Sequence, residues 1–535
     1  MGSAYASPRE HLEDELALVG KLFERQIHQH WELGVLPRIQ DEFSGTFVSS
    51  DEVSAILGGG AAPSEKGERA IAALDADIAA RTAAIEERLA GRRGAGSTLP
   101  FDRMQRVLGL SSSERRALWV LIAVELSSRM RALMRYLVNE SSRVYADVGL
   151  LELLVYAGDA RERMVRELAG DGRLLALRLV EPVGGRRAYD EAPYLLRSLR
   201  VNPRVIELAH GVVRLDRDVA RVAELVDEPP ASGELLVPDA LKSQVAALLA
   251  PEASADSPPI VVLAGPDGAG RKSLVFGAAR SGRRPVLHLR CAELAGWDLA
   301  ELGRLAQAVV REALLFDALP LFEGIDALAP HAESGRADRM RPFEQALAAL
   351  SAPVAATCAP RDGRPIALGR GLLLVDVPVP TEAARAALWR RALDVSAAAG
   401  LDFDLVASRY PITGGILLKS AAAAAALAAA RAQAGGAAGV GDGDVHAGLR
   451  STLDIKLSGL GRRVTWRQNW DDLILPDDSL EEVREFIARV KHKRRVYDDW
   501  GFARKFAKGL GLSALFAGPP GTGKTMVAGI IADEL

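Results

Sequence analysis

The fold of this chain is decided by the stretch Gly518-Pro519-Pro520-Gly521-Thr522-Gly523-Lys524-Thr525. The apolar run Ser513–Ala517 in front of it predicts a strand, and the run Met526–Leu535 behind it predicts a helix. Strand, glycine-rich loop and helix N-terminus, in that order, are the context that a P-loop needs, because backbone N–H groups and the positive helix end then face phosphates. The sequence therefore predicts an α/β module with a nucleotide site.

Each position of this loop is a candidate cofactor ligand, and the set is Gly518, Pro519, Pro520, Gly521, Thr522, Gly523, Lys524 and Thr525. Lys524 would place its ammonium group on the β- and γ-phosphates, and Thr525 would offer its hydroxyl to Mg²⁺. We therefore expect ATP and Mg²⁺ as cofactors, with Thr525 as the metal-binding residue. No catalytic residue is assigned.

A second loop, Gly265-Pro266-Asp267-Gly268-Ala269-Gly270-Arg271-Lys272-Ser273, occupies the same place in an earlier α/β module. Aligned on its glycines, it has Arg271 where the lysine is needed and Lys272 where the hydroxyl is needed. Either Lys272 and Ser273 shift the register by one position and the site is active, or the domain is catalytically dead and is kept for assembly. The third strand of the module carries a second defect, and two defects in one site favour the dead domain.

The third strand of that module is predicted at Ala313–Phe316, followed by Asp317 and Ala318. An ATPase strand of this kind ends in two acids, the first for Mg²⁺ and the second to orient the attacking water. In this interpretation Asp317 keeps the first role, but Ala318 has no carboxylate for the second.

Strand and helix signals alternate through this module, as a parallel α/β sheet requires. The other predicted strands are Ile260–Ala264, Pro285–Leu289, Val354–Thr357 and Leu372–Val377, with helices at Leu274–Arg280, Leu299–Arg311, Arg341–Leu350 and Thr381–Leu393. We expect a multidomain chain: an N-terminal helical region (1–100), a winged-helix-like domain (101–228), a first α/β module (238–400), a helical lid (401–456) and the start of a second α/β module (464–535).

The winged-helix prediction rests on helices followed by a hairpin. Ser111 to Glu114 is a helix start with a serine cap and an early acid. The run Leu174–Val180 predicts a strand, Glu181–Arg187 a Gly-Gly turn, and Ala188-Tyr189 a return strand. Such folds bind DNA through a basic wing, here Arg186 and Arg187, or serve as protein contacts.

Composition narrows the class of protein. The 535 residues carry a net charge of −3, so no global basic field predicts nucleic acid as a partner. The two cysteines, Cys291 and Cys358, exclude a disulfide framework. The N-terminus has no signal-peptide core, and the alanine run Ser420–Ala430 is too short to span a bilayer. We expect a cytoplasmic protein with no membrane partner.

These motifs resemble tandem AAA ATPases of the valosin-containing-protein type. Beside Gly518–Thr525, the entry Asp471-Asp472-Leu473 is similar, Thr357-Cys358 resembles the end of the sensor 1 strand, where the family prefers Asn over Cys358, and Tyr410–Ile416 is similar to the turn that opens the sensor 2 helix. More narrowly, a winged-helix-like region before a degenerate module looks like the AAA ATPases found beside contractile injection systems.

The resemblance implies an AAA-type ATPase that forms a homo-oligomer, expected to be a hexameric ring, and that remodels or assembles a protein partner. In the family, the second module's hydrolytic acids, sensor 1 and arginine finger follow its P-loop, so we expect this sequence to be a fragment that stops short of them. Two alternatives stay open: a winged-helix DNA-binding regulator, and a nonhydrolytic scaffold in which nucleotide stabilises subunit contacts.

Overall fold

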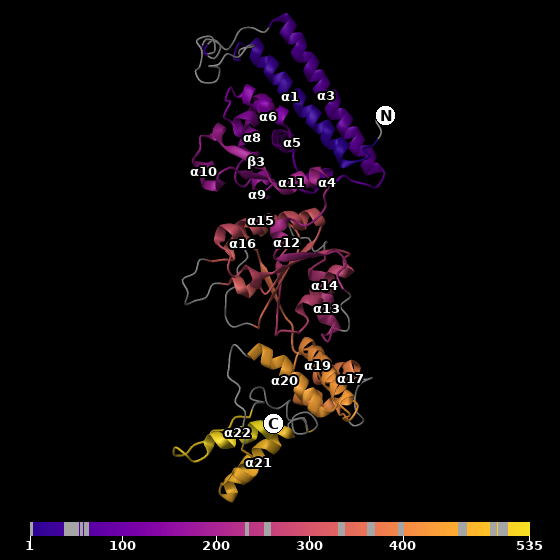
Figure 1. Cartoon of the computed structure of the whole chain (residues 1–535), viewed down its shortest axis with the longest axis vertical. Coiled ribbons are helices and arrows are strands. Elements are labelled where there is room, and N and C mark those ends of the chain that lie inside the picture. Colours follow the sequence, from indigo (N-terminus) through magenta and orange to yellow (C-terminus); the bar gives the residue numbers. More distant parts are fainter. Residues whose placement is uncertain are drawn as a thin grey trace. The chain divides into compact units, whose positions relative to one another are not determined.

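The computed structural model describes residues 4–36, 53, 57, 64–230, 235–250, 258–329, 338–360, 370–393, 401–457, 468–492, 500 and 512–534. It divides into two compact units. The first unit comprises Met1–Pro266 and Gly270–Pro378, and the second comprises Asp267–Ala269 and Val379–Leu535. Figure 1 shows the ribbon diagram of the chain.

Two long helices begin the first unit. The helix α1 (Pro8–Glu32) and the helix α3 (Glu65–Gly94) lie side by side (Figure 1). Each starts after a serine whose side chain accepts a backbone N–H, which is the usual N-cap. Leu18, Ile85 and Leu89 are buried between them. The two helices therefore share a small apolar core.

A compact helical region with a small sheet follows. Its helices are α4 (Pro100–Val107), α5 (Ser112–Leu126), α6 (Ser128–Leu137), α7 (Val148–Leu154), η1 (Gly158–Ala160), α8 (Arg161–Glu167), α9 (Arg173–Ala176), α10 (Gly185–Glu191), η2 (Tyr194–Leu196), α11 (Pro203–Ala209) and α12 (Arg217–Ala220). Strands β1 (Ala146–Asp147), β2 (Val180–Pro182) and β3 (Ser198–Val201) form an antiparallel sheet in the order β1-β3-β2. The core of this region is buried around Leu118, Trp119 and Leu151.

The predicted wing is wrong in its details. Most of the run Leu174–Val180 is helix α9 and its C-terminal turn, and only Val180 belongs to a strand. The turn expected at Glu181–Arg187 leads instead into helix α10, and the return strand is β3, which begins ten residues after Ala188. Leu174 and Leu175 are apolar because they enter the core as helical residues, a burial that a strand would also explain from sequence alone.

The α/β module of the first unit is a six-stranded sheet. Its elements are β4 (Ala223–Val226), α13 (Asp239–Leu248), β5 (Ile260–Ala264), α14 (Arg271–Ser281), β6 (Val286–Arg290), η3 (Cys291–Leu294), α15 (Leu299–Phe316), β7 (Leu319–Glu323), η4 (Ile325–Leu328), α16 (Arg341–Leu347), β8 (Val354–Cys358) and β9 (Leu372–Asp376). The order is β4-β6-β7-β8-β5-β9, with β4 antiparallel to β6 and the remaining pairs parallel.

This topology places β5 inside the sheet, between β8 and β9. Ala264 pairs with Cys358 on one side and with Asp376 on the other, so the loop after β5 begins at the carboxyl edge of the parallel strands. Ligands of open α/β sheets bind at that edge. Four of the five predicted strands match β5, β6, β8 and β9 within two residues.

The predicted third strand, Ala313–Phe316, is wrong. Those residues are the last turn of α15, and Asp317 ends the helix in the left-handed conformation with φ of 50°. The strand is β7, six residues further on, and it ends at Glu323. Leu314 and Phe316 continue the helical spacing of α15 and pack on the core from there, which an isolated apolar run does not reveal.

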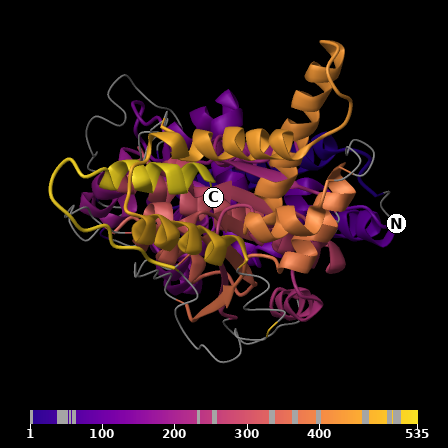
Figure 2. The same ribbon diagram turned by 90° about the horizontal axis from the view of Figure 1, so that it is seen from below.

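The second unit is helical in its described part. It contains α17 (Glu382–Leu393), α18 (Phe403–Arg409), α19 (Gly414–Gln433), α20 (Asp442–Leu457), η5 (Trp470–Asp472), α21 (Asp477–Lys491) and α22 (Lys524–Glu534). Helix α19 packs on both α17 and α20, which are orange in Figures 1 and 2. Helix α19 is long and apolar enough to cross a membrane. A single helix of this kind is weak evidence for a membrane span, because core helices of soluble proteins have the same length and composition.

The strand expected at Ser513–Ala517 does not form. These residues carry no regular secondary structure, and Leu515 is 93% exposed. A strand is stabilised by backbone hydrogen bonds to a neighbour, and no strand among the described residues of this unit lies beside it.

Candidate nucleotide-binding sites

The second loop, Gly518–Thr525, has the backbone of a phosphate-binding turn. Gly521 and Gly523 take φ of 85° and 78°, values that favour glycine, and α22 begins directly after them at Lys524. The first N–H groups of a helix have no partner within the helix. They are therefore left free to donate to an anion in front of α22.

The side chain of Lys524 is hydrogen-bonded to the backbone of its own loop. Its Nζ donates to the carbonyl oxygens of Gly518 at 2.9 Å and Pro519 at 2.6 Å, and Thr522 Oγ1 also donates to Pro519 O at 2.9 Å. The ammonium group is thus held over the loop by neutral acceptors. Phosphate oxygens carry more negative charge than carbonyls, so they would compete well for this group.

A pocket of about 470 Å³ lies against this loop. Of the predicted ligands it is lined by Gly518, Pro519, Thr522 and Lys524, whereas Pro520, Gly521, Gly523 and Thr525 do not line it. Its other wall is mostly apolar and includes Leu475, Val483, Phe486, Val527 and Ile531, with Ser479 and Glu482 as its polar members. A polar end beside an apolar wall, at this volume, suits a small ligand with a charged and a flat part.

The residues fit ATP better than they fit a metal bound by protein alone. Thr525 lies exposed in the first turn of α22, and its hydroxyl is the one predicted Mg²⁺ ligand. Among the described residues, no three His, Cys, Asp or Glu side chains gather into a metal cluster. Magnesium commonly takes few protein ligands and completes its shell with phosphates and water. Thr525 would hold it only together with a nucleotide.

The first loop keeps the same backbone with different side chains. Gly268 and Gly270 take φ of 77° and 94°, close to those of Gly521 and Gly523, and α14 begins at Arg271 as α22 begins at Lys524. The glycine alignment made from sequence is therefore confirmed in the structure: Arg271 stands at the lysine position.

The side chains of this loop are already engaged by protein. Arg271 donates from Nη1 to the carbonyl of Cys358 at the end of β8, and Lys272 Nζ lies 3.6 Å from Oε1 of Glu323. His288 connects Glu323, with Nε2 2.6 Å from Oε2, to Glu224, with Nδ1 3.1 Å from Oε1. The hydrogen bond from His288, together with the charge of Lys272, holds the pKa of Glu323 below its usual range.

Glu323 is a site residue that sequence reasoning missed. It ends β7, where the metal-binding acid was expected, and the next residue is Gly324 with φ of 70°. Asp317, which was predicted for that role, faces Arg284 at 3.5 Å instead. The apolar run Leu319–Phe322 ending in an acid was the signal for it. The site still lacks the second acid, because Gly324 has no side chain.

The two segments that resemble sensors 1 and 2 lie in different units. Thr357 and Cys358 end β8, where Thr357 Oγ1 accepts the N–H of Gly324 at 3.0 Å and the Cys358 thiol is buried. In the second unit, the turn before Gly414 does open a long helix, α19, as expected. There Thr413 Oγ1 donates to the carbonyl of Asp267 at 2.7 Å.

The expected basic wing is not a free cationic surface. Arg186 and Arg187 lie on α10 and pair one turn along with Asp190 at 3.0 Å and Glu191 at 2.8 Å. Exposed pairs of this kind contribute little stability, but each places a carboxylate beside the guanidinium. That arrangement weakens the attraction for a phosphate backbone.

Comparison with known proteins locates one domain. Residues 1–225 match the family model described as a winged helix domain, variant. A solved structure from work on the structural basis for katanin self-assembly is similar at 15% identity and a TM-score of 0.36, covering 46% of this chain and 96% of that one. No curated protein matches the sequence. The family match supports a winged helix domain in this part of the chain, and the predicted bounds 101–228 stay a prediction.

Proposed function

We propose that this chain is an ATP-binding, AAA-type ATPase whose working nucleotide site is Gly518–Thr525. The backbone of that loop carries the proposal: two left-handed glycines lead into a helix that begins at a lysine whose Nζ is already held above the turn. The P-loop motif in the sequence and the parallel sheet of the first module agree with it. Finer features, such as a hexameric ring and a protein partner that it remodels, come from the resemblance to tandem AAA ATPases.

The loop's own residues would do three things. Lys524 would exchange the carbonyls of Gly518 and Pro519 for β- and γ-phosphate oxygens, since a charged acceptor makes the stronger hydrogen bond. Thr525 would hold Mg²⁺ with its hydroxyl, and the metal would neutralise charge on the phosphates. Phe486 and Leu475 would cover the flat base, because both line the apolar wall of the pocket.

The first loop would act as a structural part without turnover. Lys272 pairs with Glu323 and Arg271 donates to the Cys358 carbonyl, so both cations already have protein partners. Gly324 supplies no carboxylate to orient water. A module of this kind would support assembly while the second module binds ATP.

The test is binding of labelled ATP with Mg²⁺ to the full chain. Lys524→Ala removes a charge-assisted contact worth about 1.5–3 kcal/mol, so affinity should fall roughly tenfold to a hundredfold. Lys419→Ala is the matched control, because Lys419 is an exposed lysine on α19 that does not line the pocket. Parental affinity in the Lys524 variant would contradict the assignment.

A DNA-binding regulator is the second candidate, favoured by the winged-helix match over residues 1–225. Duplex binding that weakens steeply with salt, and that is lost in an Arg186→Ala, Arg187→Ala variant, would support it. The ion pairs of both arginines on α10 argue against this outcome.

A further inference from the structure

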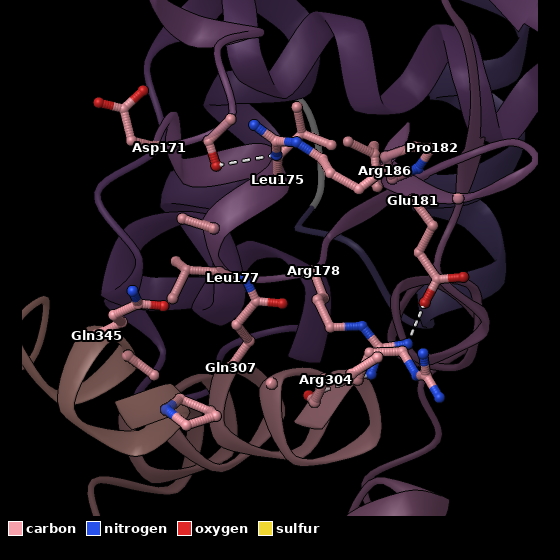
Figure 3. A pocket seen from close by; sticks show the side chains of 18 of the residues that line it. Asp171, Leu175, Leu177, Arg178, Glu181, Pro182, Arg186, Arg304, Gln307 and Gln345 are labelled. Carbon is pink, nitrogen blue, oxygen red and sulfur yellow. Dashed lines mark hydrogen bonds and ion pairs between the residues drawn. The ribbon is translucent and has the colours of Figure 1, made fainter. Parts of the chain in front are cut away.

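A groove of about 1350 Å³ runs through the first unit between the winged-helix region and the α/β module (Figure 3). Helix α9, strand β2 and the start of α10 form one wall, and α15 and α16 form the other. This volume exceeds the 300–1,000 Å³ typical of small-molecule sites. The groove therefore has room for a segment of chain.

The wall formed by α15 presents two polar side chains, Arg304 and Gln307. Ala300, Gly303, Arg304 and Gln307 follow the i, i+3, i+4, i+7 spacing of one helix face, and all four line the groove. Small residues at the first two positions let a ligand approach the helix backbone closely. From α16, Gln345 faces the same space, as Figure 3 shows.

Three of these side chains have unused hydrogen-bonding capacity. Among the described residues, no hydrogen bond or ion pair involves the side chains of Arg304, Gln307 or Gln345. Glutamine amides both donate and accept, as a peptide backbone requires, and an arginine offers five N–H donors. This set fits a polypeptide better than it fits an apolar ligand.

The charge of the groove is positive. Four arginines line it against two acids, and these are Arg178, Arg186, Arg200, Arg304, Asp171 and Glu181. Glu181 is already neutralised by ion pairs with Arg178 and, at 2.8 Å, Arg200, and it also accepts from Asn202 at 2.8 Å. The unpaired guanidinium of Arg304 therefore dominates that part of the groove.

The other wall is closed along strand β2. This strand is at the edge of its sheet, and Leu179 and Val183 bond to β3 through Asn202 and Ser198. Val180 lines the groove but is only 1% exposed, so this wall contributes shape and no open strand edge.

The groove is preformed. Arg178 takes φ of 50°, a conformation that favours glycine. The buried Arg311 donates from Nη1 to the carbonyl oxygen of Arg178 at 3.0 Å. The Arg178 side chain also donates to the carbonyl of Arg304 at 3.2 Å, which ties the two walls together. A ligand then has less ordering entropy to overcome when it binds.

We propose that this groove binds an acidic, extended segment of a partner polypeptide. Carboxylates of the segment meet Arg304, and its backbone amides meet Gln307 and Gln345. Single-stranded nucleic acid fits less well, because Tyr145 is the one aromatic side chain among the lining residues on which a base could stack.

The experiment measures fluorescence anisotropy of a labelled probe peptide of about ten residues, rich in glutamate, with the full chain. Arg304→Glu should weaken binding by roughly tenfold or more, since one charge-assisted contact is worth about a factor of ten. Gln307→Ala is a milder second variant and should weaken binding severalfold. The control is Arg187→Glu, whose side chain is 91% exposed on α10 and does not line the groove.

Three results would overturn the proposal. These are unchanged affinity in both groove variants with a native circular dichroism spectrum, an equal loss in the Arg187 control, and tighter binding of a lysine-rich peptide or a single-stranded oligonucleotide than of the acidic probe. Retained ATP binding in the Arg304 variant separates this test from that of the P-loop.

Discussion

Arg311 and Asp216 form a buried ion pair, with Nη2 of the arginine 2.6 Å from Oδ2 of the aspartate. The pair joins α15 of the α/β module to the residue that caps α12 of the winged-helix region. Glu312 lies beside it and accepts from Arg311 at 3.0 Å and from Arg204 at 3.3 Å. The two regions of the first unit are thus joined by a charge network that has little access to water.

Breaking this network from one side should destabilise the first unit. Arg311→Ala leaves the buried Asp216 without its cation and leaves Glu312 with Arg204 alone, and removing one partner of a buried pair costs about 3–5 kcal/mol. We expect a clear fall in the thermal unfolding midpoint and earlier proteolysis between residues 210 and 300. Arg187→Ala, which breaks an exposed pair on α10, should change stability by about 1 kcal/mol or less. Equal effects of the two variants would argue against a joining role.

The same pair makes the first unit sensitive to acid. Burial opposes ionisation of Asp216, but the charge of Arg311 and the N–H groups of Asp218 and Val219 outweigh it and leave its pKa below the usual value. A lowered pKa contributes stability above the unfolded pKa of about 3.9, and this contribution is lost as pH falls. Asp216→Asn should therefore be less stable at pH 7, and its unfolding free energy should change less between about pH 5 and 3. Urea titrations across that range measure both slopes, and parallel curves would contradict the assignment.

The N-terminus of α5 carries a helix cap that is visible in the sequence, and its contribution to stability can be measured. Ser111 Oγ accepts the N–H of Glu114 at 3.0 Å, Glu114 returns the bond to the N–H of Ser111 at 2.8 Å, and Ser111 also donates to Glu167 at 2.8 Å. Ser111→Ala should cost about 1–2 kcal/mol, as caps of this type do. Ser142→Ala is the control, because Ser142 is exposed and its hydroxyl donates to Glu140, the one partner it has among the described residues. A similar loss in both variants would mean that the cap contributes nothing specific.

Local signals predicted most of the elements and failed where packing decides. The Ser111 cap, the strand Ile260–Ala264 and the helix opening at Gly414 were all readable, because a cap, a buried run and a glycine pair act on their own neighbours. The runs at Ala313–Phe316 and Leu174–Val180 were misjudged as strands. A short apolar run is buried in either conformation, and its sheet partners lie far away in sequence.

In the candidate sites, too, local features could be predicted from the sequence, whereas contacts between distant elements could not. The glycines of both loops stand where the backbone takes left-handed φ values, a conformation that leaves a mark in the sequence, and their binding of nucleotide stays a prediction. Glu323 was missed because its strand was placed six residues too early. The links from Glu323 to Lys272 and His288 join three elements, α14, β6 and β7, and no spacing along the chain predicts them.

The last prediction concerns the first loop, whose backbone already has the shape of a P-loop. If only its side chains prevent binding, Arg271→Lys with Lys272→Thr should create a site, because it restores the ammonium and the hydroxyl in front of α14 and leaves Glu323 free to approach Mg²⁺. The double change is best made with Lys524→Ala, so that any ATP bound reports the first loop. We expect Mg²⁺-dependent binding at least tenfold tighter than in the Lys524→Ala parent, by labelled ATP titration. The control replaces Arg271 and Lys272 with alanine in the same parent, which removes their bonds without supplying ligands and should bind no ATP. No gain in the Lys-Thr variant, with an unchanged circular dichroism spectrum, would show that the loop is blocked by more than these two residues.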